Sequence, residues 1–233
     1  MKSQFIFDDL LQIRAPGVCF YVLRDEAGLS LIDGGFVGGL SSLERGLKFG
    51  GWENERILGV LVTHGHLDHI LNVQKIAQAS GAWIAASMED ESHYQGVPRY
   101  QGFSKLVGLA EAVGRTMFSF QPFRVEKVLR DGEFIDIWQG LQVVSLPGHT
   151  KGHLGFYCAA RRLLFCGDIF ASFGKFSHLP PSVFNVSSAQ NRASIQKALE
   201  LEVTGILPDH CDGSTPALHL QRLQRLHKKS GRL

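Results

Sequence analysis

Short apolar runs separated by turn-forming residues mark the strands of the first part of the chain. Residues 18–23 and 29–32 are two such runs on either side of a polar turn, a pattern typical of a β-hairpin. Residues 57–62 form a near-continuous apolar run, which is typical of a buried strand. Residues 83–86 are a further run of strand length. The pattern therefore predicts a sheet near the N-terminus.

Two helices are predicted among these strands. Ser-Ser-Leu-Glu at residues 41–44 is a capping box that predicts a helix start, and Gly50 and Gly51 predict its end. Apolar residues recur at helical spacing over residues 70–77, and Gly81 stands where a C-terminal cap belongs. Residues 57–86 are therefore predicted to form a strand, a loop, a helix and a second strand, in that order.

The second part of the chain repeats this organisation. Strands are predicted at residues 134–138, 141–146, 154–158, 163–166 and 205–207. A helix is predicted at residues 187–200, and a C-terminal helix is predicted to follow the last strand and to run to about residue 229. Glycines interrupt a helical insert at about residues 88–130. Two groups of strands that each carry helices predict a single α/β domain over residues 1–233. We expect a four-layer αββα sandwich of two mixed sheets.

Composition narrows the function classes. The chain has 233 residues, 44% hydrophobic and 20% charged, which is typical of a globular domain and not of a disordered or membrane chain. A net charge of +2 does not indicate nucleic-acid or lipid binding. The sequence does not predict the oligomeric state. Four cysteines without Cys-x-x-Cys spacing, and no export or membrane segment, predict a cytoplasmic protein.

Thr-His-Gly-His-Leu-Asp-His follows directly after the predicted strand at residues 57–62. His64 and His66 can point to one side of an extended segment, while Asp68 and His69 fall in the first turn of the next helix. Imidazole and carboxylate groups suit zinc, iron or manganese. The motif therefore predicts a metal centre, in preference to a solvated His-rich loop.

Three further residues stand just beyond predicted strands. His149 lies in Pro-Gly-His-Thr, Asp168 follows Cys-Gly, and His210 follows Leu-Pro-Asp. The ends of strands deliver side chains to a common cleft, so we expect these residues to join the metal centre.

These motifs in this order resemble the metallo-β-lactamase-fold hydrolases. The resemblance covers nearly the whole chain and implies a dinuclear centre at one edge of the sheets. It implies that His64, His66 and His149 bind the first metal ion and that Asp68, His69 and His210 bind the second. Asp168 would bridge the two ions.

A centre of this kind predicts a hydrolytic activity. Five neutral imidazoles and two carboxylates leave two divalent ions with net positive charge, which lowers the pKa of a shared water to about 7. The resulting metal-bridging hydroxide would attack an ester or thioester of a small molecule. Asp68 would orient this nucleophile or take its proton, as the resemblance implies.

The sequence differs from several branches of these hydrolases, and the differences narrow the activity that we expect. Metallo-β-lactamases proper lack the bridging aspartate, so Asp168 disfavours antibiotic hydrolysis. Residues 147–153, Pro-Gly-His-Thr-Lys-Gly-His, resemble the glyoxalase II branch, a group of thioesterases that cleave glutathione conjugates. The chain ends shortly after His210, without the C-terminal domain that binds glutathione in that branch. We therefore expect a zinc-dependent ester or thioester hydrolase with a small-molecule substrate.

Several residues outside the predicted ligand set are candidates for supporting roles. Asp33 is expected to support a ligand or a turn, not to bind metal. His153 is equally consistent with support of the metal centre and with packing, and the role of His178 stays open. Asp209 could add charge near the second ion or face solvent, and we favour solvent. Cys211 is expected to point away from the metal ions.

Other functions remain in competition. A mononuclear iron persulfide dioxygenase would keep the Pro-Gly-His-Thr and Gly-Asp motifs, and a phosphodiester hydrolase would use the same fold. A metal-bound scaffold protein would not need seven ligands. Iron or manganese could replace zinc in the predicted centre.

Overall fold

The structure is a computed structural model that describes residues 3–98, 100 and 105–230. It comprises two compact units. The first unit contains Met1–Arg99 and Gly108–Leu129, and the second contains Tyr100–Val107 and Arg130–Leu233. Each unit is described by itself below.

A mixed seven-stranded sheet forms the first unit. Its order is β1 (Gln4–Phe7), β2 (Leu10–Arg14), β3 (Cys19–Asp25), β4 (Gly28–Ile32), β5 (Ile57–Leu61), β6 (Trp83–Ala86) and β7 (Lys127–Val128). Neighbours from β1 to β4 are antiparallel, whereas β4 to β7 run parallel. The predicted hairpin is confirmed as β3 and β4. Strands β1 and β2 were not predicted.

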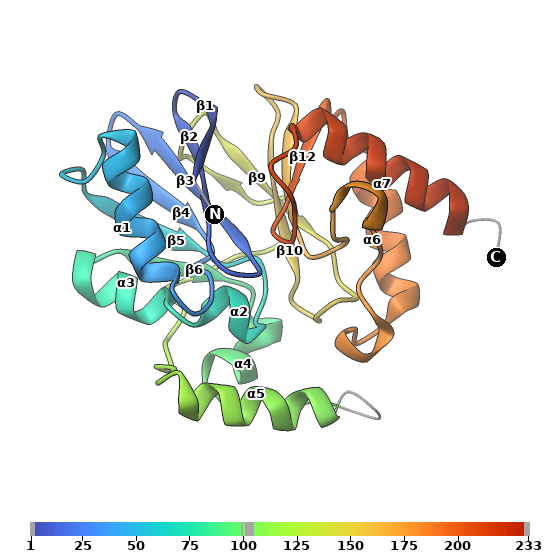
Figure 1. Ribbon diagram of the computed structural model, residues 1–233, viewed down its shortest axis with the longest axis horizontal. Helices are drawn as coiled ribbons and strands as arrows, with labels where there is room; N and C mark the ends of the chain where they lie inside the picture. The colour runs from blue at the N-terminus through green and yellow to red at the C-terminus, as the bar shows by residue number, and fades with distance from the viewer. Residues whose placement is uncertain (1–2, 99, 101–104, 231–233) are drawn as a thin grey trace. The chain divides into compact units, whose positions relative to one another are not determined.

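Helices cover this sheet. Helix α1 (Gly39–Gly50) packs against β2, and α3 (Val73–Ser80) packs against β5 and β6 (Figure 1). The predicted capping box is wrong, because α1 begins at Gly39 and Gly38 occupies the N-cap. Gly51 ends α1 at φ 71°, a left-handed conformation that glycine adopts without strain.

The second unit contains a five-stranded sheet. Its order is β12 (Gly205–Pro208), β11 (Leu163–Gly167), β10 (Leu154–Cys158), β9 (Leu141–Ser145) and β8 (Phe134–Ile135). Only β11 and β12 pair in parallel. The strand predicted at residues 134–138 is too long, because β8 ends at Ile135 and a turn with positive φ angles at Trp138 and Gln139 follows it.

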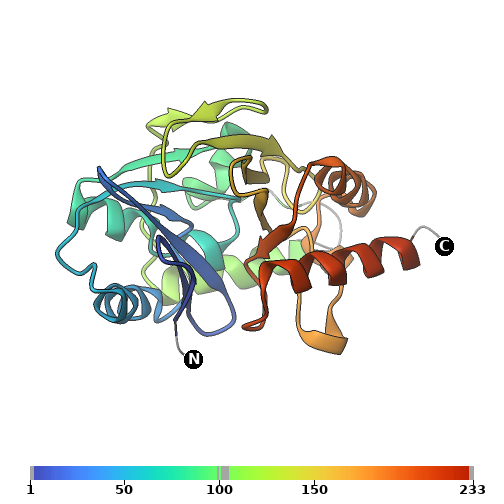
Figure 2. The ribbon, with the colours of Figure 1, turned by 90° about the horizontal axis from the view of Figure 1, so that it is seen from above.

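Two helices lie beside this second sheet. Helix α6 (Ser188–Glu200) begins at Ser187, whose hydroxyl accepts a hydrogen bond from the backbone of Gln190. Helix α7 (Pro216–Ser230) packs against β12 and α6, as Figure 2 shows in red. Both helices were predicted.

Each unit buries its own apolar core. Leu11, Phe20 and Val60 are fully buried in the first, and Leu164 and Ile206 in the second. Burial of a large apolar side chain contributes about 1.5–3 kcal/mol, so each unit has its own source of stability. The prediction of two mixed sheets with flanking helices is confirmed. None of the described helices is long and apolar enough to span a bilayer.

The predicted insert at about residues 88–130 contains short and long helical segments. They are a 3-10 turn (Met88–Asp90), α4 (Glu91–Tyr94) and α5 (Lys105–Met117). Strand β7 adds to the sheet near the end of this range. Residues 99 and 101–104 lie outside the described residues. The division into one domain with an insert stays a prediction.

Candidate metal centre

Four predicted ligands lie together in the first unit, directly after β5. We call His64, His66, Asp68 and His69 the first half-site. His66 caps the short helix α2 (Leu67–Ile70), and the other three lie beside or within it. The His64 ring centroid lies 4.9 Å from that of His66 and 4.1 Å from that of His69. His69 Nε2 lies 3.7 Å from Asp68 Oδ2. The three imidazoles are buried, whereas the Asp68 side chain is 35% exposed.

Asp33 holds residues of the first half-site in place through hydrogen bonds. This fully buried residue accepts hydrogen bonds from Thr63 N at 2.8 Å and from Thr63 Oγ1 at 2.6 Å. His69 Nδ1 lies 3.0 Å from Asp33 Oδ2. Asp33 has a φ angle of 65°, an uncommon conformation for a non-glycine residue, and such conformations cluster at functional sites. The structure thus gives Asp33 the supporting contacts predicted for it.

These contacts fix the tautomers of two imidazoles. A carboxylate only accepts, so His69 donates from Nδ1 to Asp33 and keeps a lone pair on Nε2. Thr63 uses its hydroxyl proton for Asp33, so its oxygen accepts from His64 Nδ1 at 3.0 Å. His64 and His69 therefore both offer Nε2 to a metal ion.

Residues that the sequence did not indicate hold the backbone of this loop. Asp90 Oδ2 accepts a hydrogen bond from Gly65 N at 2.9 Å, and Asp90 is buried. A Cβ at Gly65 would lie 2.5 Å from His93 Cβ, which explains the glycine. Burial lowers the pKa of His93, although nearby Asp90 and Glu111 act in the opposite direction. No spacing in the sequence marks Asp90 or His93 as partners of the loop.

The remaining predicted ligands lie together in the second unit. We call His149, Asp168 and His210 the second half-site. Asp168 Oδ2 lies 3.5 Å from His149 Nε2 and 3.0 Å from His210 Nε2. Asp168 and His149 are buried, and the His210 side chain is 28% exposed. Two imidazole nitrogens thus converge on one carboxylate oxygen.

Three contacts orient the second half-site. His149 Nδ1 donates to Asn185 Oδ1 at 2.9 Å, which leaves Nε2 with the lone pair. His153 Nε2 accepts from the backbone N–H of Asp168 at 3.0 Å, so His153 supports a predicted ligand. Ser172 N donates to His210 O at 2.8 Å. Asn185 lies in a loop and carries no signal in the sequence.

The expected exposure of Asp209 is wrong. Asp209 is fully buried, because it directly follows β12 and its backbone N–H still donates to the Gly167 carbonyl of the neighbouring strand β11 at 3.3 Å. Its charge, together with that of Asp168, adds to burial in raising the pKa of the Cys166 thiol. Cys211 is buried and is in no disulfide, and His178 is exposed with Nδ1 2.8 Å from Leu179 O.

The donor chemistry of both half-sites fits divalent transition-metal ions. Imidazole nitrogens and carboxylate oxygens are the ligands of zinc, iron and manganese centres. Ligand imidazoles in such centres bind through one nitrogen while the other donates to a protein group. His64, His69 and His149 show this arrangement.

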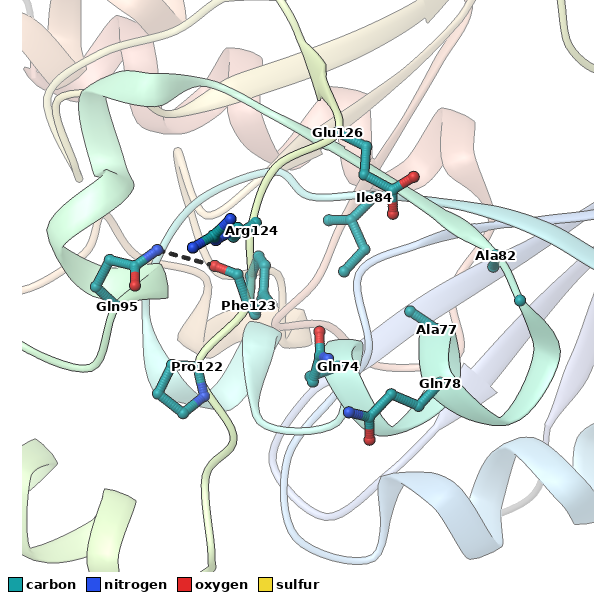
Figure 3. Close-up of a pocket in the computed structure, with 11 residues that line it drawn as sticks. Gln74, Ala77, Gln78, Ala82, Ile84, Gln95, Pro122, Phe123, Arg124 and Glu126 are labelled. Carbon is teal, nitrogen blue, oxygen red and sulfur yellow. Dashed lines mark hydrogen bonds between the residues drawn. The ribbon is translucent and has the colours of Figure 1, made fainter.

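A cavity of about 510 Å³ lies elsewhere in the first unit (Figure 3). Ala77, Ala82 and Ile84 contribute apolar surface, and Arg124 and Glu126 contribute charge. It opens near the start of β6, whereas the first half-site follows the end of the parallel strand β5. None of the seven predicted ligands lines this cavity, so it is separate from the metal chemistry.

Comparison with known proteins supports this interpretation. The sequence model of the metallo-beta-lactamase superfamily matches residues 15–210. A hydroxyacylglutathione hydrolase from Rhodobacter capsulatus is 29% identical over 129 residues, which are 54% of this chain and 40% of that protein. The hydroxyacylglutathione hydrolase GloC from Haemophilus influenzae is 27% identical over 163 residues, 67% of this chain and 68% of that protein. The chain thus spans less than half the length of the Rhodobacter relative.

Solved structures show the same fold. A metallo-beta-lactamase family protein from Thermus thermophilus matches with a TM-score of 0.72 and 20% identity, over 98% of this chain and 81% of that chain. The subclass B3 metallo-beta-lactamase BJP-1 of Bradyrhizobium japonicum matches with a TM-score of 0.70 and 17% identity. That match covers 100% of this chain and 93% of the BJP-1 chain. At these identities the likeness extends to the fold alone.

Proposed function

The chain belongs to the metallo-β-lactamase superfamily, and from this membership we propose that it is a dinuclear metal-dependent hydrolase of a small-molecule ester or thioester. The convergence of His149 Nε2 and His210 Nε2 on Asp168 Oδ2 carries the proposal. A carboxylate that bridges two metal ions lies beside imidazole ligands of both ions, and Asp168 Oδ2 lies within 3.5 Å of both imidazole nitrogens.

The proposed ligand sets follow the resemblance. His64, His66 and His149 would hold one ion, Asp68, His69 and His210 the other, and Asp168 would bridge them. The proposal requires residues of both units to share the ions. Bound divalent ions would lower the pKa of a water molecule towards neutrality and polarise the substrate carbonyl.

The chain's own residues contribute orientation and proton transfer. Asp33 and Thr63 fix the rings of His64 and His69. Asn185 fixes the ring of His149, and His153 holds the backbone of Asp168. The Asp68 carboxylate is partly exposed, so it can accept a proton from the attacking water and pass it to the leaving group.

Two observations support an ester or thioester substrate. Relatives from Rhodobacter and Haemophilus carry the name hydroxyacylglutathione hydrolase. Residues 147–153 resemble the same branch, although the chain covers only part of the Rhodobacter protein. We propose zinc as the metal, since its ligands are those present here. The four cysteines form no disulfide, which is in keeping with a cytoplasmic location.

Elemental analysis and a substrate panel test this function. Protein purified without added metal is analysed for zinc, iron and manganese and then assayed on thioesters, lactones and phosphodiesters. We expect two ions per chain and thioester or ester cleavage. One iron per chain with oxygen uptake on glutathione persulfide would assign a dioxygenase instead. A protein without metal and without activity on the whole panel would refute the proposal.

A further inference from the structure

Over its part Gly108–Met117, helix α5 turns its charged residues inward and its large apolar residues outward. The part Gly108–Met117 belongs to the first unit and carries two charged residues, Glu111 and Arg115. The Arg115 side chain is 5% exposed and that of Glu111 is 13% exposed. A helix on the surface of a globular protein usually shows the opposite distribution.

Specific contacts hold the inner face of α5. Arg115 donates to Glu111 Oε2 at 3.1 Å and to the His93 carbonyl at 3.0 Å. Gly114 approaches Leu67, because a Cβ there would lie 3.1 Å from a Leu67 methyl group. These contacts fix the rotation of α5 about its axis. The outward direction of its apolar residues is therefore a determined feature of the fold.

The outer face of α5 is apolar and exposed. Leu109 is 66% exposed, Val113 54% and Met117 69%. Ala110, Ala112 and Thr116 are the other exposed residues of this part of the helix. Among residues 107–117, whose side chains the structure describes, the outer face carries no charge. Solvent alone does not favour such a contiguous apolar stripe.

The stripe points away from the first half-site. With 3.6 residues per turn, Leu109, Val113 and Met117 lie opposite the side that holds Glu111 and Arg115. Glu111 Oε1 accepts a hydrogen bond from Leu67 N at 3.5 Å, and Leu67 lies between His66 and Asp68. Within the described part of the first unit, α2 and α4 lie on one side of α5 and no element lies on the other (Figure 1). A substrate at the proposed metal ions would therefore not cover the stripe.

We propose that this stripe binds the same stripe of a second copy of the chain, with the two α5 helices antiparallel. Leu109, Val113 and Met117 are spaced four residues apart, so a two-fold axis at Val113 places each Leu109 against Met117 of the other copy. Ala110 and Thr116 flank Val113 on this face and are small enough to allow a close approach. A patch without charge meets its own copy without like-charge repulsion.

Other partners fit the outer face less well. Helices that lie on lipid surfaces carry lysine or arginine along their polar face, whereas Arg115 is buried. An acidic or basic partner would be matched by opposite charges, which the described outer face does not offer. The 13 residues of α5 extend over about 20 Å, which is short for an interface. We therefore expect a dimer that depends on protein concentration.

Light scattering coupled to size exclusion, over a range of concentrations of the full chain, tests the proposal. We expect a dimer mass that falls to a monomer mass on dilution. Leu109→Glu with Met117→Glu places like charges opposite one another and should weaken the dimer by about 100-fold or more. Leu109→Glu with Met117→Lys places opposite charges together and should restore it. Val186→Glu, an exposed apolar-to-acid change in the second unit, is the matched control and should leave the dimer unchanged.

Oxidative cross-linking tests the antiparallel orientation. The four native cysteines are buried, so an introduced surface cysteine is the thiol that an oxidant reaches and cross-links. Val113→Cys lies on the axis and should cross-link with itself, whereas Leu109→Cys should not. Self-cross-linking of Leu109→Cys would contradict the antiparallel arrangement. A monomer at all concentrations, or a dimer that both double variants leave intact, would overturn the proposal. Stripe-dependent binding of a monomer to phosphatidylcholine vesicles would assign the stripe to a lipid surface instead.

Discussion

The hydroxyl of Thr63 donates to Asp33 Oδ2 over 2.6 Å and thereby determines which nitrogen of His64 carries a proton. The same carboxylate oxygen lies 3.0 Å from His69 Nδ1. One buried aspartate therefore sets the tautomers of two proposed metal ligands, one directly and one through a threonine. This arrangement is the basis of the first prediction.

Asp33→Asn should weaken metal binding by about 10–100-fold, the usual effect of losing a partner of a ligand imidazole. Asparagine tolerates the left-handed backbone at φ 65°, so the turn survives. Its NH₂ group cannot accept, however, and one of the donors from Thr63 or His69 would face another donor. Competition with a chelator measures the affinity. Thr63→Ser keeps the hydroxyl and should retain wild-type affinity, and unchanged affinity in Asp33→Asn would contradict the role of Asp33.

Asn185→Ala should reduce metal affinity by a similar factor of about 10–100, because His149 loses the acceptor that orients its ring. Asn185→Asp keeps an acceptor oxygen but loses the donors to Pro180 and Ser188. If ring orientation matters, the aspartate variant should bind metal much better than the alanine variant. Equal losses in both would assign Asn185 to loop structure alone.

The sequence predicted most of the strands and helices, because their apolar periodicity is local. Residues 83–86 and 154–158 coincide with β6 and β10. Strands β1 and β2 were missed, since β1 is only partly buried and the buried polar residue Gln12 interrupts the apolar run of β2. The start of α1 was misplaced, because Gly38 occupies the N-cap in a left-handed conformation that no side-chain pattern indicates.

In the candidate site, too, some residues could be predicted from the sequence and others could not. The proposed ligands stand in dense motifs or directly after strands, so the sequence reveals them. Asp90, in the 3-10 turn Met88–Asp90, and Asn185, in a loop, are distant in sequence from the residues they support, and only the folded chain brings them to Gly65 and His149. The burial of Asp209 could not be predicted either, because it depends on how β12 pairs with β11.

Asp168→Ala should remove one of two bound metal ions and most thioester cleavage while the fold is retained. The change deletes the oxygen on which His149 and His210 converge but keeps the backbone N–H that donates to His153. Elemental analysis gives the ions per chain, and circular dichroism checks the fold. A variant that keeps two ions and full activity would show that Asp168 does not bridge.

Gly65→Ala should destabilise the protein by about 1–3 kcal/mol and weaken metal binding, because the new methyl group would overlap His93. Gly51→Ala is the matched control. It has open space but a φ angle of 71°, so it should cost about 1–2 kcal/mol of stability and leave metal affinity unchanged. Denaturant unfolding and chelator competition separate the two effects. Equal metal affinity in both variants would mean that His93 does not constrain the loop.

Asp212→Asn should destabilise the protein at neutral pH and lose this effect in acid. Burial alone raises the pKa of Asp212, but hydrogen bonds from Arg222 and Ser214 outweigh it and hold the pKa at about 2. A folded-state pKa below the unfolded value of about 3.9 contributes stability that is complete above about pH 4 and is lost as the pH falls through about 2. The side chain is 34% exposed, so solvent screening limits the effect to about 1 kcal/mol or less. Free energies of unfolding of both proteins between neutral pH and pH 2 measure it, and a difference that stays constant over this range would show that the Asp212 charge contributes nothing to stability.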